Sequence, residues 1–369
     1  MESVFEKAEG NSDFYPIFNK KRGIMYPAKS PGITVEIERR IRRGLYTGRL
    51  PDNGTLQSEF KVARQTMTEA LRPLVKRGVL RCHAPRTGLE IDGAALVTGR
   101  IMIVSGVANA ETQRLQREIL LDGFVPDYFV PRSFQDFRQS LSVSTPLGVL
   151  FMNSALTVEM ANLLQKKRIP FVSCNQLPIL SSAINSIDYD LELDMRWLLE
   201  LLMKEGYRRI TYFFSGRMEG YNELALKTFC KVKRALGLPV EKCDRVLSAW
   251  NRPLRENLEN KLRAVFRRPP FPQVMLSVAD LREEMEQICE AGKIPIPRNF
   301  WILCESNRQK RKNIQGNCRC YHSLLAQWRL WGAGYDFLRE VILGIHPRPL
   351  QRLIPRPHAL DCDIPPCHA

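Results

Sequence analysis

The hydrophobic period of this chain changes near residue 95, and that change limits the architectures the chain can adopt. Between residues 32 and 76, apolar side chains recur every three or four positions, as on one face of an α-helix. From about residue 98 onward, short and nearly continuous apolar runs alternate with helical segments. We therefore predict an α/β protein in which a small helical domain precedes a larger domain with parallel sheets.

Residues 1–31 show neither period and are rich in Gly, Asn, Ser and Pro, so we expect a flexible arm there. The start of the chain, Met1–Glu9, contains acidic residues and no apolar stretch, which argues against a secretory signal. The most apolar window, Leu147–Val158, is too short to span a bilayer. These features predict a cytoplasmic protein without a membrane partner.

Three helices are predicted between residues 32 and 76. The first has an apolar stripe formed by Ile33, Ile37, Ile41 and Leu45. Its opposite side is basic and carries Arg39, Arg40, Arg42 and Arg43. The second runs from about Thr55, as its N-cap, to Phe60. The third runs from Arg64 to Lys76 and buries Met67, Ala70, Leu71 and Leu74. A β-hairpin wing is expected to follow.

The polar side of the third helix suits a DNA duplex. At 100° per residue this side carries Gln65, Glu69, Arg72 and Lys76, with Thr68 on its flank. Between Gly32 and Gly88, 12 Lys or Arg stand against five Asp or Glu. Such a basic excess gains free energy by displacing counterions from phosphates. A three-helix unit with a wing can place one polar helix in a major groove.

The run Leu50–Leu71, with Gly78-Val79-Leu80 and Gly88, resembles the winged helix–turn–helix of GntR-type bacterial transcription regulators. The resemblance covers residues 32–93 and includes Val62-x-Arg64-x-Thr66 at the start of the third helix. It implies DNA contacts from Arg64, Gln65, Thr66, His83, Arg86, Thr87 and Gly88, and helix geometry adds Thr68 and Arg72. Gly54 and Thr68 stand where the family often has Arg. Pro73 is expected to bend the helix, because it removes a hydrogen bond to the Glu69 carbonyl.

The second part of the chain is predicted to contain parallel sheets covered by helices on both faces. The apolar runs are 100–105, 147–152, 170–174, 209–214 and 272–277, and the helical segments between or beside them include 157–167, 191–204, 223–236 and 281–291. The length of this part favours two lobes with a cleft at the carboxyl ends of the strands.

Residues 98 to about 360 resemble the periplasmic-binding-protein-like effector domain of LacI-type repressors. The whole segment 98–369 is expected to bind the ligand and to form the dimer. The matching pieces are Ile169-Pro170-Phe171-Val172, Asp190, Gly206–Ile210, Gly237, Asp280 and Ile294-Pro295-Ile296-Pro297. A GntR-type head on a LacI-type body is similar to the arrangement in arabinose-type repressors. The resemblance implies that Asp280 faces the effector. It places Ala225 where the family has a sugar-binding Arg, which argues against a simple sugar.

Four residues at or near predicted strand ends are candidates for the effector site: Asn175, Tyr221, Trp250 and Asp280. A set that combines polar and aromatic side chains suits a polyol or a sugar. For Tyr221 and Trp250 the alternative is a place in the core or at the rim of the cleft. For Asp280 the alternative is a cap on the helix that begins at Leu281.

No enzyme motif is found, and no catalytic residue, cofactor or metal site is predicted. Cys362, Cys367 and His368 could bind a metal with His358, but the prolines between 347 and 366 favour a frayed tail. The basic excess from Arg298 to Arg356 is expected to be a solvated surface.

The function predicted from these features is that of a homodimeric, ligand-responsive transcription regulator, a repressor of carbohydrate-related genes. Its partners would be a double-stranded DNA operator and a small-molecule effector. A dimer is expected because one winged head contacts only one half-site. The alternative is an α/β solute-binding or enzymatic protein whose basic N-terminal domain docks a protein partner.

Overall fold

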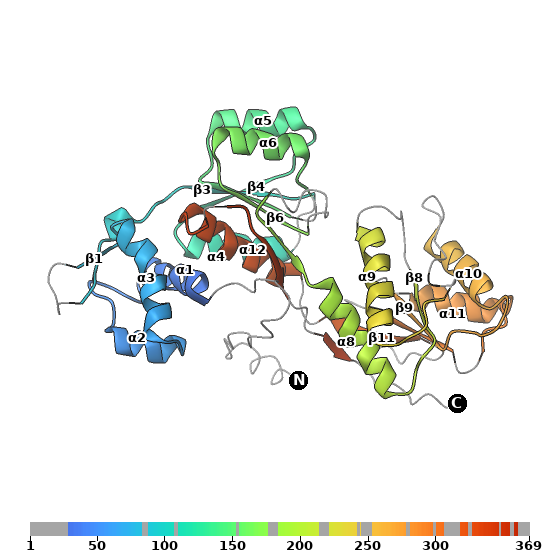
Figure 1. Ribbon diagram of the computed structural model, residues 1–369. Coiled ribbons are helices and arrows are strands. Elements are labelled where there is room, and N and C mark those ends of the chain that lie inside the picture. Colours follow the sequence, from blue (N-terminus) through green and yellow to red (C-terminus); the bar gives the residue numbers. More distant parts are fainter. Residues whose placement is uncertain are drawn as a thin grey trace, which may run out of the picture.

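The structure has three parts: a three-helix unit, an N-terminal lobe and a C-terminal lobe (Figure 1). The structure is a computed structural model. It describes residues 29–82, 88–106, 110–152, 155–175, 184–213, 221–241, 244, 253–277, 281–297, 300–305, 318–323, 327–346, 348–354 and 358–360. The predicted arm therefore lies outside the described residues, except for residues 29–31, which belong to the first helix.

The three-helix unit contains α1 (Lys29–Arg42), α2 (Asn53–Phe60) and α3 (Arg64–Lys76), followed by the antiparallel strands β1 (Leu80–Arg81) and β2 (Glu90–Ile91) and the 3₁₀ turn Gly93–Ala95. The four apolar residues predicted on the inner side of α3 are buried, and α3 continues through Pro73. The prediction for Leu45 was wrong, because α1 ends at Arg42 and leaves Leu45 69% exposed. Asp52, rather than Thr55, caps α2: its Oδ1 accepts hydrogen bonds from the N–H groups of Gly54 and Thr55 at 2.9 and 3.0 Å.

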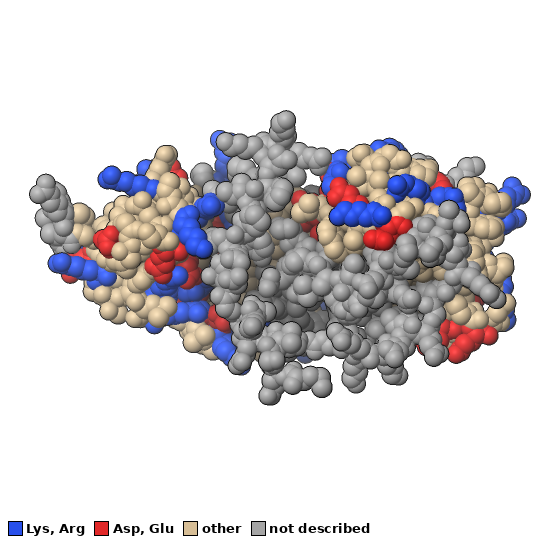
Figure 2. All heavy atoms as spheres, turned by 90° about the horizontal axis from the view of Figure 1, so that it is seen from below, with Lys and Arg blue, Asp and Glu red and all other residues tan. Residues whose placement is uncertain are grey.

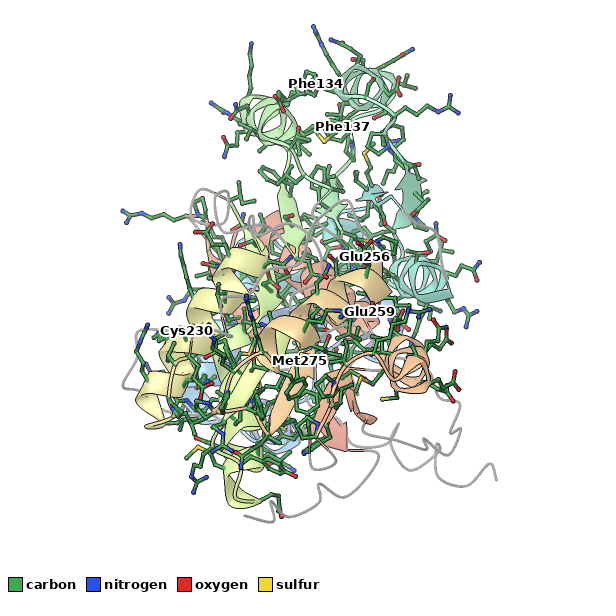
Figure 3. The ribbon with its side chains drawn as sticks, turned by 90° about the vertical axis from the view of Figure 1, so that its right-hand side faces the viewer. Phe134, Phe137, Cys230, Glu256, Glu259 and Met275 are labelled. Carbon is green, nitrogen blue, oxygen red and sulfur yellow. The ribbon has the colours of Figure 1, made fainter. Side chains whose placement is uncertain are left out.

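The N-terminal lobe has a six-stranded parallel sheet in the order β12-β7-β6-β5-β3-β4. Its strands are β3 (Arg100–Val104), β4 (Val125–Phe129), β5 (Gly148–Phe151), β6 (Phe171–Cys174), β7 (Ser186–Tyr189) and β12 (Gln351–Ile354). Helices α4 (Ala110–Leu121) and α12 (Gln327–Ile342) cover one face, and α5 (Phe134–Val143) and α6 (Val158–Lys167) cover the other. In β3, Ile101 and Ile103 pack toward α4 and α12, whereas Met102 packs toward Phe137 of α5 (Figure 3). This alternation follows from the two-residue period of a strand.

The C-terminal lobe has a five-stranded sheet in the order β13-β11-β10-β9-β8, in which only β13 is antiparallel to its neighbour. Its strands are β8 (Ile210–Phe213), β9 (Val274–Ser277), β10 (Trp301–Glu305), β11 (Cys318–Ser323) and β13 (His358–Leu360). Its helices are α8 (Leu191–Lys204) and α9 (Tyr221–Ala235) on one face and α10 (Leu254–Val265) and α11 (Arg282–Ala291) on the other. Met275 of β9, labelled in Figure 3, packs on the side of α10 and α11.

The chain passes between the lobes after β7, after β11 and after β12. At the first passage, the carboxylate of Asp190 caps α8 by accepting a hydrogen bond from the N–H group of Leu193 at 3.0 Å. Burial raises the pKa of Asp190, and the nearby carboxylates of Asp194 and Glu192 act in the same direction. The prediction of two lobes built on parallel strands is confirmed. All five apolar runs named above contain strands.

Two predictions about the end of the chain are contradicted in part by the described residues. Within the Pro-rich segment, β12 pairs with β7 and β13 pairs with β11, so those parts are not a frayed tail. Two members of the late basic excess, Arg339 and Arg352, are buried rather than solvated, since carboxylates of Asp122, Glu38 and Glu340 receive their hydrogen bonds. Residues 361–369, with Cys362, Cys367 and His368, lie outside the described residues. Within the described ranges, no helix is long and apolar enough to cross a membrane.

Candidate nucleic-acid interface

The outer side of α3 is a polar surface. Arg64, Gln65, Thr68 and Arg72 are exposed on it together with Glu69 and Lys76, and Thr66 is half-buried. The amide of Gln65 donates to the Glu69 carboxylate at 3.2 Å, and the Thr68 hydroxyl donates to the Arg64 carbonyl at 2.9 Å. Ala63 occupies the N-cap position of α3 without a side-chain cap, so N–H groups of the first turn are available to an acceptor.

The antiparallel strands β1 and β2, beside α3, occupy the position predicted for the wing. Leu80 pairs with Ile91 and Arg81 pairs with Glu90. Gly88 has φ +78°, a left-handed conformation that glycine adopts without the steric cost of a Cβ. The other residues predicted for the wing, His83, Arg86 and Thr87, lie outside the described residues.

The arginines of α1, Arg39, Arg40 and Arg42, and the next residue, Arg43, do not form a free basic face. Arg40 pairs with Glu36 and Glu59, and Arg42 pairs with Glu38 at 2.8 Å. Arg39 and Arg43 reach out of the unit and pair with acidic residues of the N-terminal lobe, among them Asp122. In the view from below, Figure 2 shows acidic side chains between the basic ones on this unit. Exposed basic residues in the described part of the unit that lie outside these ion pairs include Lys29, Arg49, Lys61, Arg64, Arg72 and Lys76, whereas the exposed Arg81 pairs with Asp92.

The three-helix unit is joined to the N-terminal lobe by what we call the docking cluster, formed by Glu38, Arg39, Arg43, Asp122, Tyr335 and Arg339. The Asp122 carboxylate, at the end of α4, accepts hydrogen bonds from Arg39 Nε (3.2 Å), Arg43 Nε (2.8 Å), Tyr335 Oη (3.1 Å) and Arg339 Nη1 (2.8 Å). Arg339 Nη2 also donates to Glu38 Oε2 at 3.0 Å and to the Val35 carbonyl at 3.3 Å.

Further contacts surround the docking cluster. Arg42 Nη2 donates to the Val97 carbonyl at 2.8 Å, and Arg77 Nη1 donates to the Ile342 carbonyl at 3.0 Å. The guanidinium of Arg42 also lies 4.3 Å from the centroid of the Phe124 ring, a cation–π contact. The unit is therefore held on the lobe by more than the chain segment that links them.

The protonation of Asp122 depends on the arginines of the docking cluster. Burial by itself would raise its pKa, but the charges of Arg339, Arg39 and Arg43 outweigh burial and hold the pKa of Asp122 below its ordinary value. Asp122 therefore remains a carboxylate at neutral pH, and its charge compensates the guanidinium groups around it. Burial raises the pKa of the neighbouring Tyr335 hydroxyl, which stays protonated and donates to Asp122.

The predicted effector residues are described only in part. Asn175 is half-buried, follows the last residue of β6 and has φ +55°. Tyr221 begins α9, and its side chain is not described; Trp250 and Asp280 lie outside the described residues. Ala225 is buried on α9, in the core against Phe229 and Tyr212. Of the four residues, only Asn175 has a side chain that lies within the described part of the chain.

Sequence reasoning missed the docking cluster. The spacing of Glu36 before Arg40 and of Glu38 before Arg42, four residues in each case, was a local signal for ion pairs along α1. No local signal identifies Asp122 and Arg339 as partners of α1, because they lie far along the chain from it. No group of three or more metal-ligating side chains occurs within the ranges that the structure describes.

The comparisons with solved structures identify the fold. A regulatory protein of the LacI family from Chloroflexus aggregans is 14% identical, with 71% of this chain and 96% of that chain covered and a TM-score of 0.57. A putative transcriptional regulator LacI from Bacillus cereus subsp. cytotoxis is 13% identical, with 74% and 99% covered and a TM-score of 0.55. A complex of the transcriptional regulator CelR with cellobiose is 13% identical, with 84% and 99% covered and a TM-score of 0.51.

The predicted periplasmic-binding-protein-like fold is thus confirmed. No protein-family model and no curated protein matches the chain.

Proposed function

We propose that this protein is a ligand-responsive transcription regulator, a homodimeric repressor of carbohydrate-related genes. The observation that carries the proposal is the exposed polar side of α3, on a three-helix unit joined to a two-lobed α/β body. We assign DNA reading to α3 and to a wing of the GntR type, with the lobes binding a small-molecule effector. The fold shared with a LacI-family regulator supports this assignment, and another similar structure is a complex of the transcriptional regulator CelR with cellobiose.

The DNA-binding part of the proposal predicts which side chains read bases. Arg64→Ala and Gln65→Ala are each expected to reduce discrimination between a selected duplex and random DNA by about 1–3 kcal/mol, the value of a lost base contact. Lys76→Ala, at the end of α3, is expected to weaken binding evenly across sequences. The measurement is a competition assay with duplexes selected from a random pool by the wild-type protein. A homodimer should select pseudo-palindromic duplexes.

Arg255→Ala is the matched control, because it removes one exposed positive charge from α10 in the C-terminal lobe. It should leave discrimination unchanged. If Arg64→Ala and Gln65→Ala also retain full discrimination, α3 is not the reading helix. If no duplex is selected, the proposal gives way to the alternative of a basic domain that docks a protein partner.

The effector-binding part of the proposal is tested at Asp280. Asp280→Asn keeps the size of the side chain and removes its charge, so affinity should fall by roughly 1.5–3 kcal/mol if the carboxylate accepts a strong hydrogen bond from the effector. Calorimetric titration of both proteins with a panel of sugars and polyols that includes cellobiose measures the difference.

The alternative for Asp280 is a helix cap, and Asn caps a helix about as well as Asp. The structure begins α11 at Arg282 with Leu281 in the N-cap position, so Asp280 precedes that position by one residue. Equal affinities of the wild type and Asp280→Asn, for a compound that binds the wild type, would contradict a role of Asp280 in the effector site.

A further inference from the structure

Helix α12 connects three parts of the molecule. It is 16 residues long, and it begins four positions after the last residue of β11 in the C-terminal lobe. It packs across β5, β6 and β7 of the N-terminal sheet and also against α1 of the three-helix unit. Figure 1 shows it between the sheet and the three-helix unit. A shift of α12 would therefore change its contacts with the sheet and with the three-helix unit at the same time.

Helix α12 packs unusually close to the N-terminal sheet. A Cβ at Gly334 would lie 2.4 Å from Sγ of Cys174, whose side chain is buried at the end of β6. A Cβ at Gly148 of β5 would lie 3.0 Å from Cδ1 of Ile342. Two glycines, one on the helix and one on the sheet, thus allow the approach. Because interiors are close-packed, adding one methyl group at either place must displace something.

The other side of α12 holds the three-helix unit. Arg339 bridges Asp122, which directly follows α4, to Glu38 of α1, and Asp336 pairs with Arg39. Near the end of the helix, the Ile342 carbonyl accepts the hydrogen bond from Arg77, which follows α3 directly. Both α1 and the end of α3 are therefore bonded to α12. The orientation of α3 depends on where α12 lies.

We propose that α12 is the positioning element of the DNA-reading unit: its depth on the N-terminal sheet sets the orientation of α3 relative to the lobe. The proposal rests on the function proposed above for α3. In that function, the angle of α3 on the lobe determines how the two heads of a dimer meet two half-sites, so α12 is placed to change operator binding without touching DNA.

The test moves α12 without altering the unit. Gly334→Ala introduces a methyl group that meets Cys174 and is expected to lift α12 from β6. The readout is the distance between spin labels at Thr68 of α3 and Val143 of α5, both exposed, attached through an introduced keto amino acid and measured by pulsed electron paramagnetic resonance without DNA. The wild type should give one narrow distribution, and Gly334→Ala should shift or broaden it by several ångströms. The double variant Cys174→Ala/Gly334→Ala should restore the narrow distribution, because the clashing sulfur is removed.

Leu141→Ala is the matched control, since Leu141 is buried on the opposite face of the same sheet, in the core that β3 and β5 form with α5 and α6. It should weaken the lobe and leave the distance unchanged. If Gly334→Ala does not fold, Gly148→Ala gives the milder displacement from the sheet side. A distribution identical to that of the wild type, or a change no larger than that of Leu141→Ala, overturns the proposal. Because the measurement uses no DNA, a failure to bind DNA would contradict the proposed function alone.

Discussion

Asp122→Asn is expected to lower the free energy that holds the three-helix unit on the N-terminal lobe by about 3–5 kcal/mol, the usual cost of breaking a buried ionic group. The Asp122 side chain is fully buried and accepts hydrogen bonds from Arg39, Arg43 and Arg339. The variant keeps the shape of the carboxylate but leaves three guanidinium groups without their shared counter-charge. Differential scanning calorimetry should then resolve a separate transition for the unit at a lower temperature than the lobe.

Glu118→Gln provides a closely matched control for this substitution. Glu118 lies one turn before Asp122 on α4 and pairs with the same Arg43, but its side chain is 43% exposed. Exposed pairs contribute about 0–1 kcal/mol, so this variant should melt like the wild type. If Asp122→Asn and Glu118→Gln give the same calorimetric profile, the docking cluster does not hold the unit in place.

The affinity for a selected DNA duplex should fall about a thousandfold between 50 and 200 mM salt for each three-helix unit, which corresponds to a log–log slope of about −5. This slope is shallower than the slope expected if all 12 basic residues between Gly32 and Gly88 contacted phosphates. The reason is that Arg39, Arg40, Arg42 and Arg43 are already paired with carboxylates and displace no counterions from phosphates. Fluorescence anisotropy over a series of salt concentrations measures the slope.

Two variants that remove the same charge separate the paired arginines from the free ones. Arg72→Gln, on the exposed side of α3, should make the slope shallower by about one. Arg40→Gln, whose guanidinium pairs with Glu36 and Glu59, should leave the slope unchanged. An equal effect of the two substitutions would contradict the assignment of Arg40 to structural ion pairs. A slope near zero would exclude phosphate contacts altogether.

Periodicity within a single element was enough to predict most of the secondary structure. The buried side of α3 follows from the 3.6-residue period of Met67, Ala70, Leu71 and Leu74, and α8 has the predicted bounds. The strands that the sequence did not reveal carry weaker local signals. β4 reads VPDYF and lies at the edge of its sheet, and β12 reads QRLI within a Pro-rich segment. Pairing with a neighbouring strand, rather than the local pattern, makes them strands.

The sequence by itself determined the exposed polar side of α3, the order of the units and the parallel sheets, because each depends on residues a few positions apart. Only the tertiary structure decided which arginines are free. Arg39 and Asp122 lie 83 residues apart, and Arg339 and Asp122 lie 217 residues apart. Their pairing requires α1, α4 and α12 to be packed together, and burial then makes each charge depend on its partners. A run of arginines looks the same in sequence whether it faces phosphate or a buried carboxylate, and the fold decides between the two.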